Sequence, residues 1–60
     1  MPEPQSKGHI LVIDDEADIR ESLEFLLTGE GFRIELASRA VEGLEKLARH
    51  EYDLVLLDLM

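Results

Sequence analysis

Three aspartates are the residues of this sequence best suited to chemistry. Asp14 and Asp15 follow the apolar run Ile10–Ile13, and Asp58 follows a second apolar run, Leu54–Leu57. Carboxylate oxygens are the ligands that Mg²⁺ prefers, and a carboxylate can also act as the nucleophile in phosphoryl transfer. A single aspartate after a strand is usually a helix cap or a turn residue. A metal site or a phosphoryl-transfer site therefore requires that the side chains of all three aspartates lie close together.

The apolar pattern predicts the elements that hold these aspartates. Residues 9–13 and 54–57 are continuous apolar runs, which are typical of strands covered on both faces, whereas residues 32–37 alternate as in a strand with one solvated face. Between the strands the spacing is helical. The first helix begins at Ala17 and the second covers Arg39 to about Arg49, with apolar stripes formed by Ile19, Leu23, Leu26 and Leu27, and by Ala40, Val41, Leu44, Leu47 and Ala48.

Polar residues and glycines predict where these helices begin and end. Asp15 or Glu16 suits the first helix N-terminus, where negative charge is favourable, and Ser38 is the predicted N-cap of the second helix. Gly31 is the predicted left-handed cap after the first helix. Gly43 weakens the second helix by about 1 kcal/mol relative to Ala, so we expect packing to hold that helix.

The element order strand–helix–strand–helix–strand predicts an α/β fold with parallel strands and right-handed crossovers. The alternating second strand belongs at an edge, which gives strand order 2-1-3, the start of a flavodoxin-like doubly wound sheet. The third strand, apolar on both faces, calls for a further neighbour that these residues do not supply. Parallel strands end at one edge and lie about 4.8 Å apart, so the three carboxylates should converge there. Their mutual repulsion favours a cation, and Mg²⁺ is the predicted one.

Composition limits the classes of function. Fourteen acidic and six basic residues give a net charge of −8, which repels phosphate backbones and argues against direct nucleic-acid binding. Without cysteine there is no disulfide and no thiol nucleophile. No apolar run is long enough to cross a bilayer, and residues 1–8 lack the apolar core of a secretory signal. We therefore predict a cytoplasmic protein with a flexible lead-in at 1–8 and a folded segment at 9–60.

The two acidic motifs together carry a family resemblance. Residues 10–16, the pair Ile19–Arg20 and residues 52–60 closely resemble two-component receiver domains, and more loosely the receivers of sigma-54-type transcription activators. The resemblance implies the first half of a receiver, a phosphoacceptor module in signal transduction whose partner is a histidine kinase. It implies no conventional enzyme, although the parent protein would catalyse its own phosphotransfer and dephosphorylation.

The resemblance also implies roles for individual residues. Asp58 matches the aspartate that accepts the phosphoryl group from the kinase. Asp15 and Asp58 match direct Mg²⁺ ligands, Asp14 matches an acid that acts through water, and Met60 matches the position whose backbone carbonyl completes the metal shell. Receivers also use a Ser or Thr after a fourth strand and a Lys after a fifth, and neither has a counterpart in these residues.

Two other hypotheses stay open. One is a truncated receiver fragment without competent phosphotransfer, which self-associates as a homodimer or higher oligomer through the bare edge of its third strand. The other is an enzyme of the haloacid-dehalogenase type, which ranks lower because that pattern needs a second Asp where Met60 stands. His9 and His50 have no ligand partner at useful spacing, so we expect surface or strand-edge positions for them.

Overall fold

The computed structural model describes residues 7–58, and the chain forms three strands and two helices over this range. In chain order they are β1 (His9–Ile13), α1 (Ala17–Gly29), β2 (Arg33–Ala37), α2 (Ala40–Arg49) and β3 (Leu54–Leu57). The predicted element order is confirmed. The second strand and the second helix each begin one residue later than the sequence pattern indicated.

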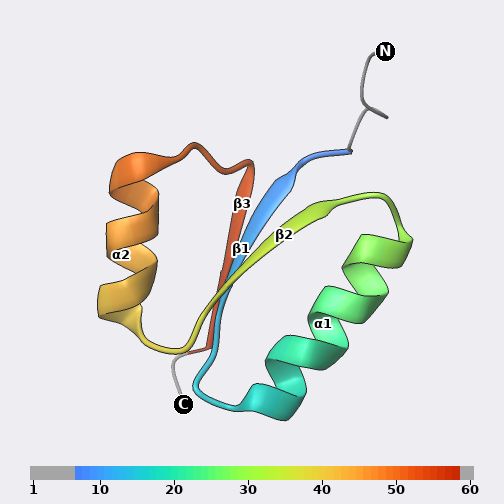
Figure 1. Ribbon diagram of the computed structural model, residues 1–60, viewed down its shortest axis with the longest axis horizontal. Helices are drawn as coiled ribbons and strands as arrows, with labels where there is room; N and C mark the ends of the chain where they lie inside the picture. Colours follow the sequence, from blue (N-terminus) through green and yellow to red (C-terminus); the bar gives the residue numbers. More distant parts are fainter. Residues whose placement is uncertain (1–6, 59–60) are drawn as a thin grey trace.

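The strands form one parallel sheet in the order β2-β1-β3, as predicted. Ile13 at the end of β1 is in register with Ala37 of β2 and Leu57 of β3. Figure 1 shows α1 and α2 on opposite sides of the sheet, with the carboxyl ends of the strands together at the lower edge. This edge is where doubly wound sheets bind their ligands.

The core of the fold is the central strand. Four consecutive residues of β1, Ile10 to Ile13, are buried, and Ala37 of β2 joins them. β3 differs, because Leu54 and Leu57 are each 50% exposed. Within residues 7–58 the outer edge of β3 pairs with no strand.

The predicted helix stripes are only partly covered. In α1, Leu23 and Leu27 are half-buried, whereas Ile19 and Leu26 are exposed. In α2 the only buried residue is Gly43, and every residue of the predicted stripe is exposed (Ala40, Val41, Leu44, Leu47 and Ala48). The reason is the width of the sheet. The helices contact β1 and β2 but not β3, and two strands about 4.8 Å apart are too narrow to cover a broad stripe.

The prediction that Ser38 is the N-cap of α2 is wrong. The N-cap is Arg39, in an extended conformation, without a side-chain cap hydrogen bond. Ser38 lies one position earlier, where its main-chain N–H and its hydroxyl both donate to Glu42 Oε1, at 3.0 and 3.1 Å. Glu42 thus reaches back from the first turn of α2, as the acidic partner in a capping box does, and ties down the residue before the cap.

Gly31 has the predicted left-handed conformation, with φ of +100°. Its N–H donates to the carbonyl of Thr28 at 3.0 Å, and the N–H of Phe32 donates to the carbonyl of Leu27 at 3.1 Å. These two bonds form a Schellman motif, which satisfies carbonyls at the end of α1 and turns the chain into β2.

At the opposite edge of the sheet, β1 and β3 are joined at their starts. The main-chain N–H of His9 donates to Asp53 Oδ2 at 2.7 Å, and the N–H of Asp53 donates to the carbonyl of His9 at 2.7 Å. The ring of Tyr52 lies 4.4 Å from that of His9, centroid to centroid. His9 therefore lies half-buried at the start of the central strand, at the opposite end of β1 from the aspartates. Neither helix of the described chain has the length and hydropathy required to span a membrane.

Candidate acidic site

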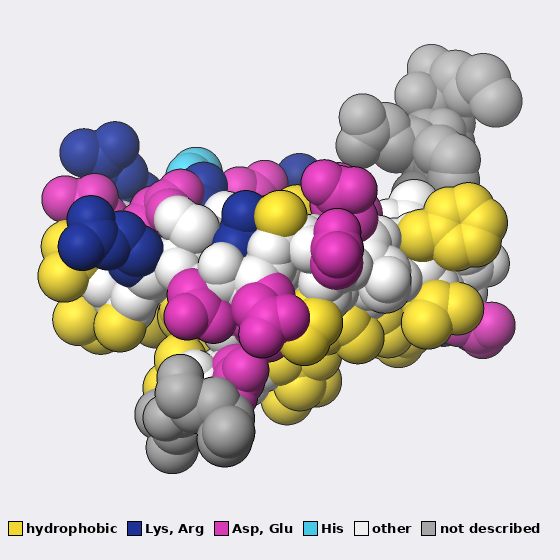
Figure 2. All heavy atoms as spheres, turned by 90° about the horizontal axis from the view of Figure 1, so that it is seen from below, with side chains coloured by type: hydrophobic (Ala, Val, Ile, Leu, Met, Phe, Trp, Pro, Cys, Tyr) yellow, Lys and Arg dark blue, Asp and Glu magenta, His cyan; other side chains and the backbone are white. Residues whose placement is uncertain are grey.

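The side chains of Asp14, Asp15 and Asp58 lie together. Each offers one carboxylate oxygen, and these oxygens all lie within 4.8 Å of one another. Figure 2, which looks onto the edge where the strands end, shows acidic side chains gathered near the middle of that face. The expected convergence is therefore observed, while the roles of the three residues as ligands and acceptor stay predictions.

Main-chain hydrogen bonds beyond the strand ends place these residues. The N–H of Asp58 donates to the carbonyl of Ile13, and the N–H of Asp14 donates to the carbonyl of Ala37, both at 3.1 Å. Each bond continues the parallel pairing past the last residue of a strand. The chain therefore turns away from the sheet only after these aspartates have been positioned.

Asp14 and Asp15 differ in their surroundings. Asp14 is only 6% exposed, and its Oδ1 accepts a hydrogen bond from the main-chain N–H of Glu16 at 2.9 Å. The carbonyl of Asp14 accepts a second bond, from Nη1 of Arg20, at 2.6 Å. Asp15 is exposed. The loop thus holds one carboxylate rigidly at the base of the site and presents the next to solvent.

The donor set suits a hard divalent cation. All three groups offer oxygen, and two direct ligands of one Mg²⁺ ion lie at most about 4.2 Å apart, close to the spacing found here. Mg²⁺ usually takes few protein carboxylates and keeps water in its other positions. The residues therefore fit a magnesium site. Met60, the remaining predicted ligand, lies outside the described residues.

The sequence reasoning missed the role of Arg20 at this site, although it used Arg20 as part of a motif. Helical side chains tilt toward the N-terminus of their helix, so a long side chain in the first turns of α1 can reach the preceding loop. The charge of Arg20 also contributes to lowering the pKa of Glu42, after the two hydrogen bonds from Ser38 and the charge of Lys46. Arg20 thus places a positive charge near the loop of Asp14 and near Glu42.

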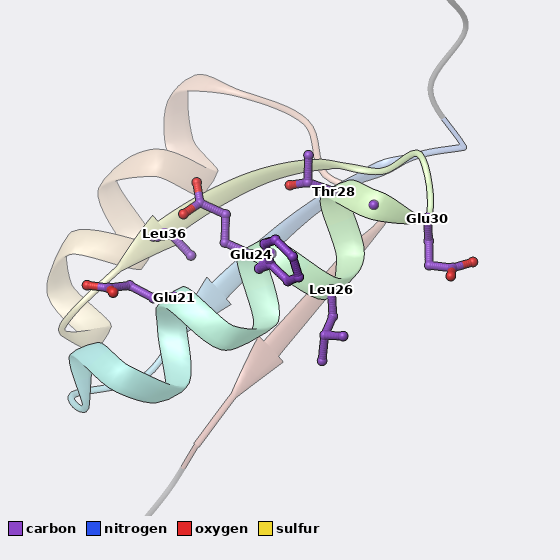
Figure 3. Close-up of a pocket in the computed structure, with 8 residues that line it drawn as sticks. Glu21, Glu24, Leu26, Thr28, Glu30 and Leu36 are labelled. Atoms are coloured by element: carbon purple, nitrogen blue, oxygen red, sulfur yellow. The ribbon is translucent and has the colours of Figure 1, made fainter.

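A separate groove lies along the outer side of α1 (Figure 3). Glu21 and Glu24 lie beside it, with Leu36 of β2 on its far side, and Phe25, another of its lining residues, is 79% exposed. None of the three clustered aspartates lines this groove. It is therefore distinct from the acidic site and adds nothing to the chemistry there.

Most of the sequence of this chain matches a known family. The profile of the response regulator receiver domain matches residues 10–60. The chain belongs to this family. Receiver domains of response regulators bind Mg²⁺ at an acidic pocket, and the three aspartates of this chain form a cluster that could hold a metal ion.

Several curated proteins resemble this receiver over most of its length. An uncharacterized transcriptional regulatory protein of Bacillus subtilis, YkoG, is 43% identical over 54 residues, which are 90% of this chain and 24% of that protein. The response regulator MprA of Mycobacterium leprae is 45% identical over 51 residues, 85% of this chain and 22% of MprA. The chain thus spans about a quarter of the length of these relatives.

A solved structure supports the fold of the receiver. The crystal structure of full-length FixJ from B. japonicum superposes with a TM-score of 0.84 at 42% sequence identity. The match covers 92% of this chain and 27% of the FixJ chain. The flavodoxin-like arrangement of parallel strands predicted from the sequence is therefore confirmed by both the topology and this likeness.

Proposed function

We propose that this chain is the phosphoacceptor part of a two-component response regulator, in which Asp58 takes a phosphoryl group from a histidine kinase. The observation that carries the proposal is the convergence of the Asp14, Asp15 and Asp58 carboxylates at the carboxyl edge of the sheet. Membership of the receiver family supports it. A single exposed aspartate would carry no such weight, because isolated acidic side chains are common at turns.

In the proposed reaction a carboxylate oxygen of Asp58 attacks the phosphorus of a phosphohistidine on the kinase. The new P–O bond forms an acyl phosphate, the P–N bond breaks, and the kinase imidazole leaves with the electron pair and regains a proton. Later attack by water on the phosphorus releases inorganic phosphate and restores the carboxylate. Positioning and charge stabilisation dominate such transfers, so the arrangement of the neighbouring aspartates matters as much as the nucleophile.

We propose that Asp14, Asp15 and Asp58 hold Mg²⁺, with the backbone carbonyl of Met60 as a further ligand. When bound, the ion would neutralise negative charge on the phosphoryl oxygens and on the carboxylates. Asp15 and Asp58 would contact it directly, and buried Asp14, already fixed by the Glu16 N–H, would act through water. The exposed position of Asp15 leaves a path for the ion from solvent.

The whole protein would contribute more than these residues. We propose that residues 9–60 form the first part of the receiver domain and residues 1–8 a lead-in. The Ser or Thr and the Lys that receivers place after later strands would lie outside this segment. We also propose a cytoplasmic protein whose receiver binds no nucleic acid itself, since its net charge of −8 repels phosphate backbones.

The test is phosphorylation of the full-length protein with acetyl phosphate and Mg²⁺, followed by intact mass measurement. We expect one phosphoryl group on the wild type and on Asp18→Asn, a matched control that removes one acidic charge from the first turn of α1. Asp58→Asn should show none. Treatment with hydroxylamine should remove the group, because it cleaves acyl phosphates.

Two results would contradict the assignment of Asp58. One is an equal phosphoryl adduct on the wild type and on Asp58→Asn. The other is an adduct that survives hydroxylamine, since that would place the phosphate on a hydroxyl group. A parallel titration with Mg²⁺, followed by amide NMR shifts at residues 14–16 and 58, checks the metal site independently of phosphorylation.

A second candidate function, self-association, is favoured by the exposed side of β3. Leu54 and Leu57 are half exposed, and in the described residues no strand covers the outer edge of β3. A bare strand edge next to apolar side chains is a template for pairing with another chain. We therefore propose that a polypeptide of residues 1–60 on its own forms a homodimer or higher oligomer through β3, without competent phosphotransfer.

Light scattering of that polypeptide tests this second candidate. We expect an oligomer at micromolar concentration that weakens at low salt, because two chains of charge −8 repel each other. Leu54→Lys should dissociate it, whereas Phe25→Lys, which adds the same charge on the exposed side of α1, should not. A folded wild-type monomer at micromolar concentration would rule out self-association through β3.

A further inference from the structure

The side chain of Arg20 bridges the start of α1 and the loop that carries two of the three clustered aspartates. Arg20 lies in the second turn of α1, and its Nη1 donates to the main-chain carbonyl of Asp14 at 2.6 Å. Arg20 is half-buried. Hydrogen bonds from a charged donor are about twice as strong as neutral ones, so this contact restrains the loop strongly.

Apart from the bond from the N–H of Asp14 to the carbonyl of Ala37, which continues the strand pairing, the loop has few other restraints. Between β1 and α1 only three residues intervene, and the N-cap of α1, Glu16, makes no side-chain cap hydrogen bond. The Asp14 carboxylate instead accepts the N–H of Glu16 at 2.9 Å, which folds the chain back over Asp14. The side chain of Arg20 binds the same residue at its main-chain carbonyl. Asp14 is thus held by its carboxylate and by its backbone at once.

We infer that Arg20 is a positioning residue for the acidic site, which sets the β1–α1 loop so that the Asp14 and Asp15 carboxylates face Asp58. The inference rests on the proposed magnesium site, and it adds a residue that does not itself bind the ion. Residues that orient metal ligands from outside the coordination shell typically change metal affinity 10- to 100-fold when they are replaced.

Because Arg20 is positively charged, its positioning role can be distinguished from a purely electrostatic effect on Mg²⁺ binding. A guanidinium near three carboxylates repels a divalent cation, so removal of its charge alone would tighten Mg²⁺ binding. Loss of positioning would weaken binding instead, because the Asp14 and Asp15 carboxylates would no longer be held beside Asp58. The two explanations therefore predict opposite changes in the Mg²⁺ dissociation constant.

The experiment compares three variants of the full-length protein. Arg20→Met keeps the aliphatic stem and removes the donor. Arg20→Lys keeps the charge but replaces the planar fork with a single ammonium group. Arg33→Met is the matched control, because it removes the same charge from an exposed residue at the opposite end of the strands. The readouts are the Mg²⁺ dissociation constant from calorimetry and, without metal, hydrogen exchange of the Glu16 amide.

We expect Arg20→Met to raise the Mg²⁺ dissociation constant about tenfold and to speed exchange of the Glu16 amide without metal. Arg20→Lys should raise the constant by a smaller factor, about threefold, because its single charge centre is a poorer match for the Asp14 carbonyl. Arg33→Met should match the wild type in both readouts. Exchange in α1 beyond its first turn reports whether each variant is folded.

The inference is overturned if Arg20→Met, folded, binds Mg²⁺ as tightly as the wild type or more tightly. If Arg20→Met fails to fold, a wild-type constant and wild-type Glu16 exchange in Arg20→Lys overturn it equally. A wild type that binds no Mg²⁺ would instead contradict the proposed metal site. The exchange measurement would then still decide whether Arg20 holds the loop, so the two failures are distinguishable.

Discussion

The side chain of Ile13 occupies the space that a methyl group on Gly43 would need. A Cβ built at Gly43 would overlap Cδ1 and Cγ1 of Ile13 and would lie 3.9 Å from Cβ of Ala37. Gly43 is the only buried residue of α2 in the structure as described. The glycine therefore allows α2 to approach the end of β1 closely, at Ile13, the residue that precedes Asp14.

Replacement of Gly43 by Ala should destabilise the protein. Helix propensity alone would favour Ala by about 1 kcal/mol, but overpacking against Ile13 costs about 1–3 kcal/mol, so we expect a net loss. The check is the free energy of unfolding from urea titration. Ile13→Val, which removes the terminal methyl group, should recover part of the loss in the double variant. A Gly43→Ala variant more stable than the wild type would contradict this packing.

Gly31→Ala should destabilise the end of α1. The φ of +100° at Gly31 is strained for any residue with a Cβ, and the cost of a left-handed conformation is about 1–2 kcal/mol. Gly29→Ala is the matched control, because Gly29 is helical and a Cβ there meets nothing within 4 Å. That variant should gain up to about 1 kcal/mol. Equal effects of the two substitutions in urea titration would contradict the Schellman geometry.

Glu42 should titrate below its ordinary pKa of 4.5, because the main-chain N–H and then the hydroxyl of Ser38 donate to its carboxylate. A lowered pKa contributes stability above pH 4.5 that is lost as pH falls through the folded-state value. Ser38→Ala removes the hydroxyl bond and keeps the main-chain bond. We therefore expect it to raise the pKa of Glu42 part of the way back.

The measurement for Glu42 is an NMR titration of its side-chain carboxyl carbon in the wild type and in Ser38→Ala. Glu45 serves as the internal control, since it lies on the same helix and is exposed. An unchanged Glu42 titration in Ser38→Ala would mean that the hydroxyl does not contribute. The contribution of Glu42 to the pH dependence of the free energy of unfolding should be absent in Glu42→Gln.

Tyr52→Phe should be as stable as the wild type at neutral pH, or more stable by about 1 kcal/mol. The phenol oxygen is buried and has no hydrogen-bond partner among the described residues, and an unsatisfied buried polar group costs about 1–3 kcal/mol. Tyr52→Leu should be less stable, because it loses the ring contact with His9. Thermal unfolding at pH 8 checks the order of the three proteins.

The pKa of Tyr52 also leads us to expect a loss of stability at alkaline pH. Burial first, and then the charge of Glu35, raises the pKa of Tyr52 above 10.0. The unfolded chain therefore loses this proton before the folded one, and the free energy of unfolding falls as pH rises above 10. Tyr52→Phe should lack this component. An identical alkaline decline in both proteins would assign it to other groups.

Much of the fold follows from local patterns. The apolar run before Asp14 is typical of a short buried strand, and Gly31 marked the end of α1 because glycine alone adopts its conformation without strain. The position of Ser38 was harder to predict. Its cap assignment failed because Glu42 binds it from the next turn, and propensity cannot weigh such a contact against an ordinary cap.

The sequence by itself determined the element order, the parallel sheet and the placement of an aspartate after two adjacent strands, because period and residue type are local properties. The tertiary structure decided which apolar residues are covered. Leu11 is fully buried and Leu54 is half exposed although both lie in apolar runs, because burial depends on which elements lie against a strand. It also decided that Arg20 holds the Asp14 carbonyl, since that contact depends on how α1 leaves the sheet.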